Sequence, residues 1–149
     1  MDLRCLDLIV QTFKEPDMKN QIVIRLKDKQ LKKGYTDDFL PTKDTFHLNT
    51  REGKTEVINM EDAKAIFFVK KLDGNKDYKY TYKDIITGEG RKVIVHFKDG
   101  ETIIGYVLAY SPERKGFFLK PADLNGNNNR IYVIASSLKK IEIIYHEGE

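Results

Sequence analysis

The chain has 149 residues, of which 40% are hydrophobic and 33% are charged, with eight Phe, eight Tyr and no Trp. This apolar content is too high for a disordered chain and predicts a globular protein of one ordinary domain or two very small ones. The net charge of +3, from 26 basic and 23 acidic residues, lacks the strong positive bias of a dedicated nucleic-acid binder. RNA is therefore permitted as a partner but not indicated.

The N-terminal residues favour a short helix. Apolar residues of segment 3–13 recur at about helical spacing, and Glu15-Pro16-Asp17 follows as a stop. The segment has no small-residue cleavage site and is too short to cross a bilayer, so we expect no targeting signal and no membrane span. The single cysteine, Cys5, allows no internal disulfide and no cysteine pair for zinc. These features predict a cytoplasmic protein.

An internal repeat dominates the rest of the chain. Ile22-Val-Ile-Arg-Leu-Lys-Asp-Lys29 matches Val93-Ile-Val-His-Phe-Lys-Asp-Gly100, and both are alternating apolar runs that lead into Lys-Asp. The register holds without a gap and gives identities at Lys27/Lys98, Asp28/Asp99, Gly34/Gly105, Tyr35/Tyr106, Pro41/Pro112, Phe46/Phe117 and Leu48/Leu119. A longer Asn-rich and Gly-rich turn in the second copy, at 123–129, then shifts the alignment. The chain thus contains two copies of one unit, at about 20–72 and 91–145.

Each copy is predicted to be a small barrel. The alternating runs predict strands at 22–27, 30–39, 45–50, 54–60 and 64–71, and then at 92–98, 101–110, 116–121, 129–135 and 139–145. Strands this short bury a core by curling into a barrel, and Gly34 and Gly105 mark bends in the second strands. We expect a mainly β protein with a helix and first barrel at 1–72, a linker at 73–90 and a second barrel at 91–149.

The order of motifs resembles the Sm/LSm and Hfq family of small barrels. The second copy carries the resemblance best, in the strand and turn at 93–100, in Gly105-Tyr106, in Tyr110 and in Phe117-Phe-Leu119. The resemblance implies a helix before a strongly bent five-stranded barrel of Sm-like or SH3-like type. It also implies subunits that assemble into rings and bind RNA, which makes RNA binding the alternative function.

A second resemblance covers nearly the whole chain. Gly34-Tyr35, Phe46-His-Leu48, Ala63-Lys-Ala-Ile-Phe-Phe-Val69 and Asp73-Gly-Asn75 are similar to segments of uncharacterised bacterial domains of unknown function, some of them joined to signalling modules. This resemblance implies a regulatory or scaffold role.

The two copies differ in the polarity of their outer faces. The second copy has apolar residues where the first has polar ones, and the outward set predicted as an interface is Ile103, Ile104, Val107, Leu108, Phe118 and Ile134. The first copy has Lys32, Lys33, Thr36, Asp37, His47 and Asn59 there, which we expect to be solvated. An exposed patch of this size is rare in soluble monomers, so something must cover the second copy. The candidates are the N-terminal helix, the linker, the first barrel and a second copy of the chain.

The linker contains a strand-like pattern in which Tyr78, Tyr80 and Tyr82 alternate with Lys79, Thr81 and Lys83. One interpretation is a stacking platform for single-stranded nucleic acid, with bases on the tyrosines and phosphates on the lysines. The other is an extended linker whose tyrosines pack on a barrel. With the basic loop residues of the second copy, the candidate RNA or partner contacts are Tyr78, Lys79, Tyr80, Tyr82, Lys83, Arg114 and Lys115.

The sequence carries no motif for catalysis. It has no Ser, His and Asp set, no His-Glu-x-x-His, no phosphate-binding loop and no dinucleotide-binding glycine pattern. The three histidines, His47, His96 and His146, lie in or next to different predicted strands, so no metal site and no cofactor are expected. We therefore predict a non-catalytic regulatory or protein-interaction module, with a protein partner or a homodimer as the expected partner.

Overall fold

The protein is mainly β in the computed structural model, which describes residues 20–111 and 113–145. Its strands are β1 (Asn20–Leu26), β2 (Leu31–Thr36), β3 (Thr45–Asn49), β4 (Thr55–Asn59), β5 (Ala63–Val69), β6 (Arg91–Phe97), β7 (Thr102–Val107), β8 (Gly116–Pro121), β9 (Asn128–Ile134) and β10 (Leu138–Ile143). Single 3-10 turns, η1 (Met60–Asp62) and η2 (Ala135–Ser137), precede β5 and β10. All ten predicted strands are present, whereas the predicted helix at 3–13 lies outside the described residues.

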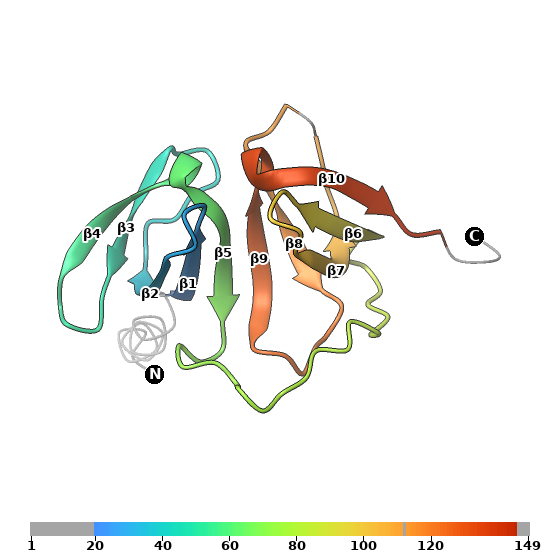
Figure 1. The fold of residues 1–149 in the computed structure, drawn as a ribbon, viewed down its shortest axis with the longest axis horizontal. Helices are drawn as coiled ribbons and strands as arrows, with labels where there is room; N and C mark the ends of the chain where they lie inside the picture. Colours follow the sequence, from blue (N-terminus) through green and yellow to red (C-terminus); the bar gives the residue numbers. More distant parts are fainter. Residues whose placement is uncertain (1–19, 112, 146–149) are drawn as a thin grey trace, which may run out of the picture.

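The ten strands form one antiparallel sheet, in the order β10-β6-β7-β8-β9-β5-β1-β2-β3-β4. Strands β1–β5 form what we call the first unit and β6–β10 the second unit, and each runs through the same sequence of four strands, a 3-10 turn and a fifth strand. The two units lie side by side, with β5 against β9 in the middle (Figure 1). The predicted pair of separate, closed barrels is not confirmed, because this pairing joins both units into a single sheet. In the described part of the chain, no helix has the length and hydropathy needed to cross a membrane.

Two hydrophobic cores lie on opposite sides of the β5 and β9 pair. Ile66 and Phe68 of β5 enter the core of the first unit, whereas Ala65 and Phe67 enter the core of the second. Strand β9 divides in the same way, with Tyr132 and Ile134 in the first core and Ile131 and Val133 in the second. Because successive side chains of a strand point to opposite faces, these two strands form a wall that both cores share. All seven residues of β5 are consequently buried.

Polar contacts reinforce the wall on the side of the second unit. The Lys64 side chain leaves β5, lies 4.6 Å from the centroid of the Phe97 ring and pairs with Asp99 at 2.6 Å. Glu101 accepts a further bond from Lys64 and lies 3.2 Å from the Arg25 guanidinium. The turn between β6 and β7 is thus tied to the first unit by two cations.

The predicted outer residues of the second unit have three different environments. Ile103 and Val107 are buried in the second core, and Ile134 is buried in the first core, so the first unit covers it. Leu108 remains 70% exposed. In the first unit, the expectation that Thr36 is solvated is wrong, because Thr36 is fully buried and its hydroxyl donates to Asp38 at 3.1 Å.

The two repeated glycines permit close approach of neighbouring strands. A Cβ on Gly34 would lie 2.3 Å from the carbonyl oxygen of Asn49, and one on Gly105 would lie 2.4 Å from that of Lys120. Both distances are far inside van der Waals contact. Any side chain at Gly34 or Gly105 would therefore push the third strand of its unit away from the second.

Candidate functional site

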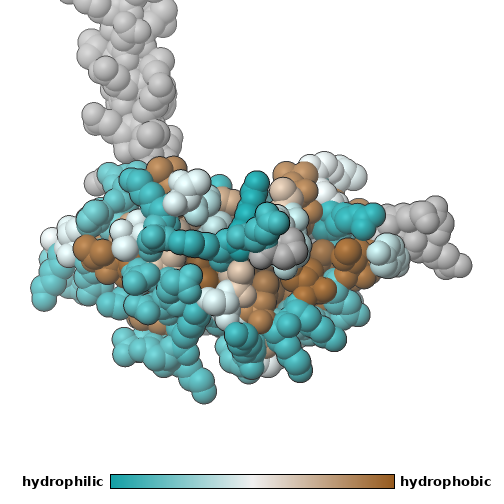
Figure 2. Space-filling model, turned by 90° about the horizontal axis from the view of Figure 1, so that it is seen from above, coloured by the Kyte–Doolittle hydropathy of each residue, from teal (hydrophilic) through white to brown (hydrophobic). Residues whose placement is uncertain are grey.

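A groove of about 1070 Å³ lies between the two units, and we call it the inter-unit groove. It is lined by the β2–β3 loop at 40–42, by Glu89, by residues 106, 108 and 109 around the end of β7, by 114–120, and by residues 129, 130 and 132 of β9. The molecule is viewed from above in Figure 2, where apolar patches interrupt the hydrophilic surface. The volume is slightly above the range of roughly 300–1,000 Å³ that is typical of ligand pockets.

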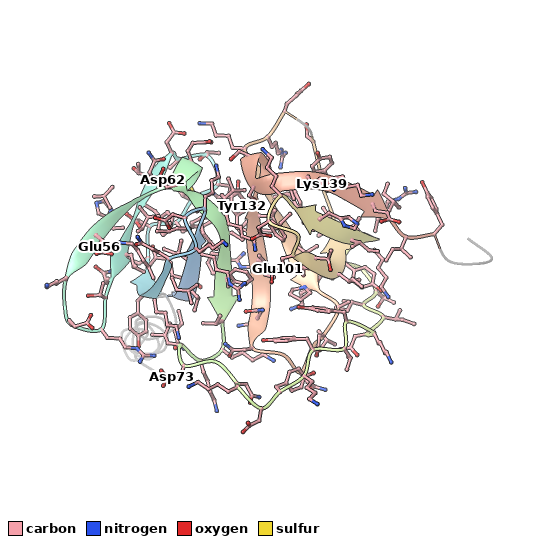
Figure 3. All side chains as sticks on the ribbon, in the orientation of Figure 1. Glu56, Asp62, Asp73, Glu101, Tyr132 and Lys139 are labelled. Atoms are coloured by element: carbon pink, nitrogen blue, oxygen red, sulfur yellow. The ribbon has the colours of Figure 1, made fainter. Side chains whose placement is uncertain are left out.

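An aromatic cluster forms the base of this groove. Phe118 of β8 lies opposite Tyr132 of β9, with ring centroids 5.0 Å apart. Phe39 of the first unit contacts both rings and also Phe68, at centroid distances of 5.2 to 6.1 Å. Tyr132 consequently lies near the middle of the molecule, where the units meet (Figure 3). Edge-to-face contacts of this kind fix ring positions, so the base of the groove is preformed.

Arg130 lies over this cluster. Its guanidinium carbon is 4.4 Å from the centroid of Phe68 and 4.5 Å from that of Phe118. Burial against the rings lowers the pKa of the Arg130 guanidinium, although the group stays charged at neutral pH. Within residues 20–111 and 113–145, no carboxylate lies within ion-pair distance of Arg130. The stacked guanidinium therefore keeps donors for an anion from solution.

Three more cations line the groove, in different environments. Lys115 pairs with Asp44 across the units, so its charge is offset, and this ion pair raises the pKa of Lys115. Lys120 donates to the carbonyl oxygen of Asn129 at 3.0 Å. Arg114 approaches Tyr132, where its positive charge opposes the rise that burial causes in the pKa of the tyrosine. Glu89 is the one carboxylate among the described lining residues, so the groove is positive overall.

Part of this groove is predictable from sequence. Arg114 and Lys115, predicted as contacts, and Leu108 and Phe118, predicted as interface residues, all lie in the lining. Arg130 was not among the predicted residues. The signal that could have indicated it is its alignment with the uncharged Thr55 of the first copy. Ile104 is half-buried in β7 and lies outside the groove lining.

The linker residues lie elsewhere, against the β8–β9 turn. Tyr78 donates a hydrogen bond to Asp123, which raises the pKa of Tyr78 to about 12. The Thr81 amide donates to the same carboxylate at 2.8 Å, and the Tyr80 ring stacks on Tyr82 with centroids 5.6 Å apart. Lys79 and Lys83 are exposed. The structure thus ties the three tyrosines to a turn, and their proposed contact with RNA stays a prediction.

The described residues contain no group of three or more His, Cys, Asp or Glu side chains placed to hold a metal ion. Two histidines make single carboxylate contacts, His47 with Asp38 at 2.6 Å and His96 with Glu142 at 3.0 Å. Both pairs lie outside the groove lining. The groove itself therefore offers cations, rings and apolar side chains, which suit binding.

A family model matches residues 18–145, and its description is a family of unknown function (DUF6982). The match spans both units of the sheet. Comparison with curated proteins and with solved structures finds no match.

Proposed function

We propose, for a chain that belongs to a family of unknown function (DUF6982), the role of a non-catalytic protein-interaction module whose inter-unit groove binds a peptide segment of a partner. The observation that carries this proposal is the groove itself, with its preformed aromatic base and the two arginines of its lining, Arg114 and Arg130. Ligand sites are typically concave, largely apolar and lined by a few placed polar groups. The groove has each of these properties.

The apolar lining supports a peptide as the ligand. Leu40 is 48% exposed and Leu108 is 70% exposed, and Pro41 and Ala109 lie beside them. Such side chains gain from burial by a partner, at about 25 cal/mol per Å² of apolar surface removed from water. Arginine and aromatic residues are also the types enriched at the centres of protein interfaces.

The chemistry of the lining supports a role without catalysis. General acid–base catalysis needs a proton donor and acceptor placed within hydrogen-bond reach of the substrate, and nucleophilic catalysis needs an activated nucleophile. Among the described lining residues there is one carboxylate, Glu89, and no His, Cys or Ser.

The test is a selection of random dodecapeptides displayed on phage against the immobilised full chain. Enriched peptides are resynthesised with a fluorophore, and their Kd values are measured by fluorescence polarisation with wild type and two variants. Ala109→Trp fills the groove from an exposed position, whereas Val57→Trp adds the same ring to β4, at a position that is 66% exposed and outside the groove.

We expect Ala109→Trp to weaken binding by about tenfold or more, which corresponds to about 1.4 kcal/mol, and Val57→Trp to leave it unchanged. Two results oppose the proposal. One is that no peptide is enriched, and the other is that enriched peptides bind both variants as tightly as wild type.

A further inference from the structure

The charge of the inter-unit groove restricts the kind of peptide that it can bind. Arg130 is held beside two rings, and Arg114, in the loop between β7 and β8, also lines the groove. Neither guanidinium has a carboxylate partner among the described residues. An arginine fork matches the planar geometry of a carboxylate and binds it through two parallel hydrogen bonds.

The stacking of Arg130 makes it a prepared anion site. Its guanidinium carbon lies 4.4 Å from the centroid of Phe68 and 4.5 Å from that of Phe118, and these two contacts restrict the side chain before a ligand arrives. The side chain is exposed on β9, so a ligand carboxylate can reach the guanidinium from solution. A ligand carboxylate would thus replace water at a cation that the fold has already oriented.

We infer that the groove binds an extended, acidic peptide segment whose Asp or Glu carboxylate is held by the Arg130 guanidinium, with neighbouring apolar side chains against Leu40 and Leu108. This inference rests on the proposed function and adds the chemical class of the ligand. The lining combines cations with the exposed apolar side chains of Leu40 and Leu108, which fits a segment that carries both acidic and apolar residues.

The same contacts favour a peptide over single-stranded nucleic acid. Base stacking needs open ring faces, yet Arg130 covers Phe68 and Phe118, and Phe39 contacts the ring of Tyr132. A nucleic-acid strand also needs a continuous positive track for its phosphates. Here Glu89 adds a negative charge to the lining, and Asp44 offsets the charge of Lys115.

The experiment uses two fluorophore-labelled pools of random dodecapeptides that differ in charge but have side chains of similar size. One pool is built from Asp, Glu, Leu, Phe and Ser, and the neutral pool replaces the acids by Asn and Gln. A dodecamer of uridine is the nucleic-acid probe. Binding is measured by fluorescence polarisation with the full chain at low and at physiological salt, since salt screens exposed ionic contacts.

Two substitutions of Arg130 separate its charge from its shape. Arg130→Gln removes the charge, and Arg130→Lys keeps a charge without the planar fork. Arg91→Gln is the matched control, because Arg91 is also exposed but lies outside the groove lining. Circular dichroism melting of each variant shows whether the fold is retained, so that a lost contact is distinguished from a lost structure.

We expect the acidic pool to bind at least about tenfold more tightly than the neutral pool, and this advantage to disappear in Arg130→Gln and shrink in Arg130→Lys. Arg91→Gln should bind as wild type does. If both pools bind equally and Ala109→Trp still blocks binding, the inference of an acidic ligand is wrong. The proposed function, binding of a peptide in the groove, then stands. If the uridine dodecamer binds more tightly than either peptide pool and its binding depends on Arg130, the ligand is a nucleic acid and the peptide inference is wrong. Binding of no probe by folded protein opposes both proposals.

Discussion

Strands β5 and β10 occupy the same place in the two units, yet they differ sharply in polarity. The repeat aligns Ala65 with Lys140 and Phe67 with Glu142. Both β5 residues are buried, whereas both β10 residues are exposed. Strand β5 has β1 on one side and β9 on the other, while β10 pairs only with β6 among the described strands. A strand with neighbours on both sides is therefore apolar, whereas a strand with one neighbour can carry charged residues at the equivalent positions.

Strands β9 and β4, the fourth strands of the two units, also differ in how far equivalent residues are buried. Tyr132 and Ile134 of β9 are buried in the first core, and their counterparts in β4 are the exposed Val57 and Asn59. Polar side chains mark both free edges, with Glu56 at one outer side of the molecule and Lys139 toward the other (Figure 3). Charged residues on an edge strand oppose pairing with further chains.

Placing the lysine of β10 at the equivalent buried position of β5, Ala65, should have the largest effect on stability. Ala65 is fully buried, so Ala65→Lys forces a longer side chain and an unpaired charge into the second core. We expect a loss of about 4 kcal/mol or more in the free energy of unfolding, enough to abolish cooperative folding. The reverse exchange, Lys140→Ala, should change stability by less than about 0.5 kcal/mol. Urea denaturation followed by circular dichroism measures both, and similar effects of the two exchanges would refute the comparison.

Removing the charges of the free edge should promote self-association. If β10 of one chain met β4 of another as β5 meets β9, Glu142 would lie opposite Glu56, in the place of Phe67 and Ile131. Like charges across a strand pair are destabilising. We expect the double variant Lys140→Ala, Glu142→Phe to sediment as larger species than wild type at micromolar concentration. Unchanged sedimentation velocity profiles would show that these charges do not limit pairing.

The two equivalent lysines should differ in their contribution to stability. Lys64→Met retains the apolar stem over Phe97 but removes the charge that faces Asp99 and Glu101. We expect a cost of about 1–3 kcal/mol, because Asp99 loses its cation and Glu101 keeps only Arg25. Lys139→Met, at the exposed counterpart, should cost less than about 0.5 kcal/mol. Thermal denaturation by differential scanning calorimetry compares them, and equal costs would contradict a special role of the buried lysine.

The smallest expected effect is a dependence of stability on pH. The hydrogen bond from Lys64 lowers the pKa of the Asp99 carboxyl from its ordinary value of 3.8. A carboxyl whose pKa is lower in the folded chain stabilises it above the unfolded pKa, and this contribution is lost as the pH falls through the folded pKa. We expect the melting temperature of wild type to fall more steeply than that of Asp99→Asn below about pH 4. Parallel curves for the two proteins would argue against this contribution.

The candidate site was only partly predictable from sequence. Arg114 and Lys115 stood out as a basic loop, and Phe118 stood out as an apolar residue with a polar counterpart, His47. Arg130 and Leu40 come from strand and loop positions about 90 residues apart in the chain, and only the packing of the two units brings them to one groove. No local pattern encodes that proximity, because it depends on the β5 and β9 pairing.

The sequence by itself determined the ten strands and the repeated order of elements, because alternating side chains and turn residues act over short distances. It also singled out Ile134 and Phe118 as outward apolar residues of the second copy. Tertiary structure decided that the first unit packs against these two residues, whereas Ile103 and Val107 belong to the second core and Leu108 stays 70% exposed. The same packing decided that Arg130 lies on Phe68, because a cation and a ring so distant in sequence meet only when the strands pair.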